Sequence, residues 1–123
     1  MDDHFMDEEH GLRLSGMMLA DGTSPGDVER ISLFYIIAGS DELYKKRRFI
    51  YDTKGHRIRS SCLVSPGVDF SSGMGALVRL GFNLYNGYRG ENGKGMTPME
   101  LFWNLDARNR RIALNALRIR MGL

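Results

Sequence analysis

Apolar positions recur at helical spacing along most of the chain, and they predict a mainly helical protein. The run over 28–38 is apolar on nearly every side and ends at Gly39, which predicts a buried helix. The run over 74–86 is closed by Gly87 and is expected to form the central helix. Because the first run is rich in β-branched residues, a strand over 28–38 is the alternative.

Capping residues predict where the other helices begin. Ser24 followed by Pro25 favours a start for the helix over 28–38, and Ser40 for a third helix with buried positions up to residue 51. Thr97-Pro98-Met99-Glu100 is a capping box with proline at the first helical position. Asp106 is expected to cap a last helix that extends to residue 121.

The stretch between these helices and the N-terminal segment lack a strong helical pattern. Residues 53–70 are expected to form a short β-hairpin or an irregular loop after a turn over 52–56. Gly11 and Gly16 interrupt the pattern over 4–20, so we expect a weakly helical or mobile arm over 1–20. The predicted fold is a single domain over 1–123, a compact bundle of five or six helices.

Charge is segregated along the chain, although its net charge is only +2. Residues 1–30 contain eight acids and two bases, whereas residues 31–123 contain 15 bases and seven acids. An acidic arm beside a basic body indicates a charged partner, and two solvated faces are the alternative.

Composition excludes several classes of protein. The single Cys62 cannot form a disulfide within the chain, and structural zinc or iron–sulfur sites need several thiolates. No apolar run approaches the roughly 20 residues of a membrane span, and the acidic start differs from a signal peptide. We therefore expect a cytoplasmic protein without membrane contact.

Two basic segments are candidates for binding a partner. Residues 45–59 carry seven bases and only one acid, Asp52, and the helix over 108–120 carries a stripe of arginines without an acid. Such clusters can contact phosphates or an acidic protein surface, or can be the solvated edge of buried helices. The predicted partner-binding residues are Lys45, Lys46, Arg47, Arg48, Arg108, Arg111 and Arg118.

A polar stripe on the helix over 74–86 is the third candidate. Arg79, Asn83 and Asn86 follow one another at i, i+4 and i+7, so they lie along one side of an otherwise apolar helix. They either fasten neighbouring loops or face a pocket for a small anion or a nucleotide.

No set of residues predicts catalysis, a metal or a cofactor. Cys62 lies six residues from His56 without a third group to orient the imidazole. His4, Glu8 and His10 have only partial metal-ligand spacing, so we assign no metal site.

Three segments of the sequence resemble a known family. Leu33–Gly39, Leu77–Gly87 and Thr97–Phe102 are similar to blocks in a family of small, mostly helical, uncharacterised proteins of Gram-positive bacteria, their phages and mobile elements. The resemblance implies a helical fold and an accessory role, such as blocking a host defence system. It implies no site residue.

We therefore expect a non-enzymatic interaction protein. The leading hypothesis is a phage or mobile-element protein that binds and inhibits a host protein or ribonucleoprotein complex, in the manner of an anti-CRISPR inhibitor. The alternatives are nucleic-acid binding through residues 45–59 and 108–120 and a small-anion or nucleotide pocket near Arg79. A homodimer is compatible with each of them.

Overall fold

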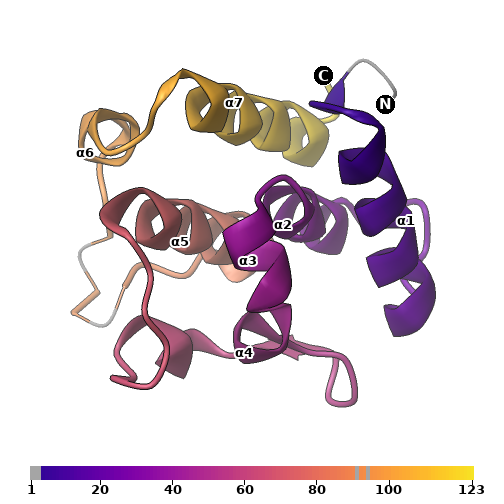
Figure 1. Ribbon diagram of the computed structural model, residues 1–123, viewed down its shortest axis with the longest axis horizontal. Helices are drawn as coiled ribbons and strands as arrows, with labels where there is room; N and C mark the ends of the chain where they lie inside the picture. Colours follow the sequence, from indigo (N-terminus) through magenta and orange to yellow (C-terminus); the bar gives the residue numbers. More distant parts are fainter. Residues whose placement is uncertain (1–3, 91, 94) are drawn as a thin grey trace.

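Helix α2 (Val28–Ala38) runs through the centre of the protein, and the other long helices surround it (Figure 1). The computed structural model describes residues 4–90, 92–93 and 95–123. Within these residues, the other helices are α1 (Glu8–Asp21), α3 (Asp41–Lys45), α4 (Arg47–Ile50), η2 (Ser60–Leu63), α5 (Ser72–Asn86), α6 (Pro98–Trp103) and α7 (Ala107–Met121). Strands β1 (Tyr51–Asp52) and β2 (Arg57–Ile58) pair antiparallel. The mainly helical fold is thus confirmed.

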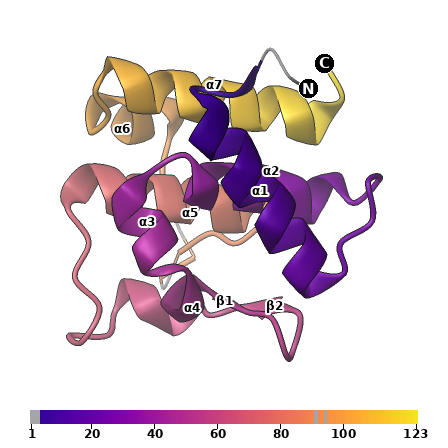
Figure 2. The same cartoon turned by 45° about the vertical axis from the view of Figure 1, so that its right-hand side comes forward.

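The burial of α2 explains its central place. Eight consecutive residues, 31–38, are buried, and α1, α5 and α7 pack against them (Figures 1 and 2). The helix over 28–38 is confirmed, and the alternative strand is wrong. The helix over 74–86 is confirmed as α5, but the central helix is α2, because α2 packs against α1, α5 and α7 while α5 leaves Asn83 and Asn86 exposed to solvent.

Side-chain caps fix the helix boundaries. Ser71, Thr97 and Asp106 each accept a hydrogen bond from a backbone N–H in the first turn of the following helix, as predicted for the last two. Helix α2 begins later than Ser24-Pro25 suggests, because Asp27 accepts from the Arg30 N–H at 3.1 Å and is the N-cap. Because caps act locally, they are the part of the fold most readily predicted from sequence.

The N-terminal segment differs from the weakly helical or mobile arm expected over 1–20. From residue 8 it forms the 14-residue helix α1, with Asp7 as N-cap and Gly22 in the left-handed conformation at its C-terminal end. Leu14 and Met17 of this helix are part of the core against α2. Packing of one apolar face therefore outweighs the cost of two glycines in the helix.

The third predicted helix is divided at Lys46 into α3 and α4, which gives seven α-helices in the described residues instead of five or six. Tyr51 leaves the helix to pack edge-on against Phe34, with ring centroids 4.9 Å apart. The chain then forms a short hairpin around a turn at 53–56, and not after the turn as expected, and continues into η2.

Gly81 marks the closest approach of α5 to α2. A Cβ atom built on Gly81 would lie 2.8 Å from Leu33 Cδ1 and 4.0 Å from Leu33 Cα. A glycine in the middle of a helix costs about 1 kcal/mol relative to alanine. Here that cost is offset by the tight packing of the two helices.

Gly81→Ala is expected to lower the free energy of unfolding by about 1 kcal/mol, because overpacking against the fully buried Leu33 outweighs the gain in helix propensity. Gly16→Ala is the matched control. A Cβ atom at Gly16 meets nothing within 4 Å, so this change should stabilise α1 by about 0.5–1 kcal/mol. Urea unfolding measures both, and a stabilising Gly81→Ala would contradict the close approach.

His10 is buried between α1 and the end of α2 in its neutral form. Its Nε2 lies 2.8 Å from the backbone carbonyl oxygen of Tyr35, and its Nδ1 accepts from the Met6 N–H at 3.2 Å. Since the backbone N–H can only donate, the ring proton lies on Nε2. Burial lowers the pKa of His10.

The lowered pKa of His10 predicts that stability falls on acidification. Below the ordinary histidine pKa of about 6.5 the unfolded chain binds a proton that the folded chain resists. The contribution of the neutral His10 to the free energy of unfolding is therefore fully present above that pH. It is lost progressively as the pH falls toward the lowered pKa of His10 in the folded state. Urea unfolding at a series of pH values should show this loss in the native protein and a flatter profile in His10→Gln. Equal profiles would contradict a buried neutral His10.

Candidate functional site

Five basic side chains that form no ion pair among the described residues lie along α3, α4 and the hairpin that follows them. We call Lys45, Arg47, Arg48, Lys54 and Arg57 the basic corner. Among the described residues, none of the five lies within ion-pair distance of a carboxylate. Four of them are exposed, and Arg47 is half-buried. The corner is therefore a local excess of positive charge that can bind an anion.

The remaining bases of this segment are used within the fold. Lys46 pairs with Glu42 at 3.5 Å and donates to the backbone carbonyl of Asp69. Arg59 lies 3.6 Å from Asp52, the one acid of the segment. Of the predicted binding residues in 45–48, Lys46 is thus engaged in an ion pair, and Arg47 also donates to the backbone carbonyl of Tyr44 at 2.8 Å.

A cleft opens between α1 and α4 beside the basic corner. It has a volume of about 320 Å³, and we call it the α1–α4 cleft. Its lining residues are Gly16, Met17, Ala20, Phe34, Tyr44, Arg47, Arg48, Tyr51 and Thr53. Apolar and aromatic side chains thus lie next to two arginines.

Two features hold the α1–α4 cleft open. Gly16 has no side chain, and the space where its Cβ would lie is empty. The Tyr44 ring is placed between two guanidinium groups, with Arg13 Cζ 4.5 Å and Arg47 Cζ 4.1 Å from its centroid. Arg13 is in turn held by Glu9 and Asp41, each at 2.6 Å. The wall of the cleft is therefore preorganised.

A polar network fixes the hairpin that carries Lys54 and Arg57. The buried Asp21 carboxylate accepts from the Tyr51 hydroxyl at 3.0 Å and lies 2.8 Å from Nδ1 of His56. Arg30 donates to the Tyr51 hydroxyl and to the backbone carbonyl of His56, both at 2.9 Å. This network ties the hairpin to the end of α1 and the start of α2.

The network holds the hairpin in place through groups of fixed charge, Asp21 and Tyr51. Burial raises the pKa of Tyr51 to about 12, so the hydroxyl stays protonated at neutral pH. Burial alone would raise the pKa of Asp21, but hydrogen bonds from Thr23, His56 and Tyr51 outweigh it and lower that pKa. Asp21 and Tyr51 therefore keep one charge state each across the physiological range.

The sequence gives little sign of this network. Asp21 precedes Gly22 and is typical of a turn, and Tyr51 fits a helical pattern as a buried position. Residues 21 and 30 are at least 21 positions from residues 51 and 56 along the chain, and the two pairs meet only through tertiary packing. His56, with φ of 53°, is the one non-glycine residue of positive φ in the described part of the chain.

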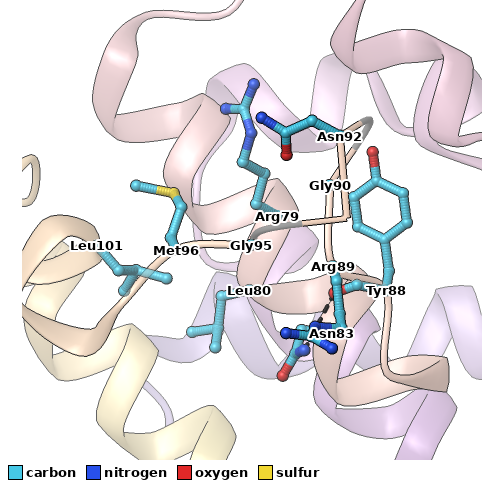
Figure 3. Close-up of a pocket in the computed structure, with 10 residues that line it drawn as sticks. All are labelled: Arg79, Leu80, Asn83, Tyr88, Arg89, Gly90, Asn92, Gly95, Met96 and Leu101. Carbon is cyan, nitrogen blue, oxygen red and sulfur yellow. Dashed lines mark hydrogen bonds between the residues drawn. The ribbon is translucent and has the colours of Figure 1, made fainter.

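Arg79 lines a second cavity, of about 370 Å³, together with Asn83 (Figure 3). The cavity lies between α5 and the loop that carries Gly90 and Gly95, with Leu101 of α6 at its apolar end. Asn83 donates to the backbone carbonyl of Tyr88 at 3.0 Å, as drawn in Figure 3, so it fastens the loop.

Asn86 does not line the Arg79 cavity with the other two residues of the stripe. Its side-chain oxygen accepts from the Tyr88 N–H at 3.1 Å. The stripe is therefore divided: two amides hold the loop after α5, and one arginine faces a cavity.

The arginines of α7 lie away from the basic corner. Both views place α7 at the upper edge of the molecule and α4 at the lower edge (Figures 1 and 2). Arg108 donates to the carbonyl of Gly39 at 3.1 Å and lies 3.7 Å from Asp7. Arg111 and Arg118 are exposed. The two basic segments predicted to bind a partner thus form separate surfaces.

The described residues contain no group of three His, Cys, Asp or Glu side chains that could hold a metal ion. Cys62 is buried in η2, whereas His56 is exposed on the hairpin turn and lies against Asp21. None of the helices in this described part of the chain is long and apolar enough to cross a membrane.

Comparisons with known proteins give the family and nothing finer. No curated protein and no solved structure matches the chain. A family described as "Family of unknown function (DUF6075)" matches residues 1–122, which is nearly the whole sequence. The chain therefore belongs to this family of unknown function.

Proposed function

We propose that the protein is a non-enzymatic binding protein for single-stranded nucleic acid. The observation that carries the proposal is the basic corner: five cations without a paired carboxylate beside a cleft lined by aromatic side chains. Proteins that bind single strands combine positive charge along the backbone with aromatic surfaces for the bases.

Each part of the site has a role in this proposal. Phosphates contact the exposed Lys45, Arg48, Lys54 and Arg57 and release counterions. One unstacked base enters the α1–α4 cleft and packs against Met17 and the Arg48 guanidinium, because the Tyr44 ring is already in contact with Arg13 and Arg47. A paired base is not free to enter such a cleft, so a single strand binds better than a duplex.

The cellular use of such binding stays a prediction. A phage or mobile-element inhibitor of a host complex acts by occlusion and needs no chemistry of its own. A ribonucleoprotein of a defence system would offer a strand to the basic corner. Affinity capture from a host lysate, with and without nuclease, tests this role, and capture that nuclease leaves unchanged would contradict a nucleic-acid contact.

Filling the α1–α4 cleft is expected to weaken binding without weakening the fold. Gly16→Leu puts an apolar side chain into the space that the base would occupy, and we expect affinity for a labelled single-stranded RNA to fall about tenfold. Fluorescence anisotropy measures affinity and urea unfolding measures stability.

Gly16→Ala is the control for this experiment, because its small side chain leaves most of the cleft open. Its affinity should stay within about twofold of the native protein. Native affinity in a folded Gly16→Leu protein would show that no base enters the α1–α4 cleft.

A further inference from the structure

The outer face of α1 is an unpartnered packing surface. Glu8, Leu12, Ser15 and Leu19 lie on the side opposite its buried residues, with spacings of four, three and four. Leu12 is 66% exposed and Leu19 is 85% exposed. The spacing is that of a seam along which one helix packs against another.

The outer face of α7 has the same spacing and the opposite charge. Its members are Ala107, Arg111, Leu114, Arg118 and Met121. Leu114 is 52% exposed and Met121 is 63% exposed, beside a groove of about 480 Å³. Neither Arg111 nor Arg118 lies within ion-pair distance of a carboxylate in the described residues.

We propose that these two faces bind each other between two copies of this chain. Antiparallel helices pack the first position of one seam against the fourth of the other. That register places Glu8 opposite Arg118, Leu12 opposite Leu114, Ser15 opposite Arg111 and Leu19 opposite Ala107. An acid thus meets an arginine, and a leucine meets a leucine.

Charge favours this pairing over the other combinations. Two antiparallel α7 faces with Leu114 packed on its copy would place Arg111 opposite Arg118, and two antiparallel α1 faces would place Glu8 opposite Leu19, without a cation on the seam. Each chain carries both faces, and Figure 2 shows α1 and α7 as neighbouring helices, with Asn115 of α7 donating to the carbonyl of His4, just before α1, at 3.2 Å. Two copies can therefore use both faces reciprocally.

A charge swap tests the pairing. Sedimentation of the full chain without nucleic acid, over a range of protein concentrations, should show a monomer–dimer equilibrium. Arg118→Glu should raise the dissociation constant of the dimer at least about tenfold, because it places two acids together. Adding Glu8→Arg to Arg118→Glu should bring the constant back to within about threefold of the native value.

Arg57→Glu makes the same change of charge on an exposed side chain of the basic corner and should leave the dimer unchanged. Circular dichroism confirms that each variant is folded. A native protein that stays monomeric at every concentration would overturn the proposal, and so would a folded Arg118→Glu protein with an unchanged dissociation constant or a double variant without recovery.

Discussion

Replacing Asp21 with asparagine is expected to lower the free energy of unfolding by about 3 kcal/mol. The Asp21 carboxylate accepts from the Thr23 hydroxyl at 2.7 Å and the Tyr51 hydroxyl at 3.0 Å, and its side chain is 2% exposed. An amide keeps the shape but offers a single acceptor oxygen, and its NH₂ group would face donors. The Thr23 or Tyr51 hydroxyl would then lose its acceptor. Urea unfolding at neutral pH would measure the resulting loss of stability.

Asp27→Asn is the matched control for Asp21. Asp27 also pairs with Arg30, at 2.9 Å, but its side chain is 21% exposed. Asparagine is an equally good N-cap, so we expect a loss below about 1 kcal/mol. Equal losses at the two positions would contradict the special role of the buried carboxylate.

Neutralising the exposed part of the basic corner is expected to remove most of the affinity for single-stranded nucleic acid. Replacing Lys45, Arg48, Lys54 and Arg57 with glutamine removes four phosphate contacts. We expect affinity at low salt to fall roughly a thousandfold, since such contacts act uniformly and independently of base sequence. Fluorescence anisotropy with a labelled strand measures the change.

A variant of the α7 arginines tests whether binding depends on the basic corner or only on the net charge of the protein. Arg111 and Arg118 are exposed on the opposite edge of the molecule. Replacing both with glutamine should leave affinity within about threefold of native, because screening over about 10 Å limits their influence on the basic corner. A loss as large as that of the corner variant would show that net charge, and not the basic corner, determines binding.

Local signals explain which parts of the fold could be predicted from sequence. The capping box at Thr97 and the cap at Asp106 each act on the helical turn that follows, so a few consecutive residues are enough to predict them. The end of the third helix is different. The helix is interrupted at Lys46, and after α4 Tyr51 packs on Phe34, a contact that joins residues distant in the chain.

The candidate site shows the same division. The sequence shows the basic residues of 45–48 and Arg57 as a charge cluster, but it does not show which of them form ion pairs. In the structure Lys46 is bound to Glu42 and to the backbone carbonyl of Asp69. The α1–α4 cleft depends on Gly16, which has the appearance of a helix-weakening residue in the sequence. Its role appears only once residues of α1 and α4 line the same cleft.

The salt dependence of binding tests the proposed function most directly. A labelled single-stranded RNA is titrated with the native protein at several salt concentrations. Four phosphate contacts predict that the logarithm of the association constant falls against the logarithm of salt with a slope of about −3. A flat response, or no binding at low salt, would contradict a nucleic-acid site at the basic corner.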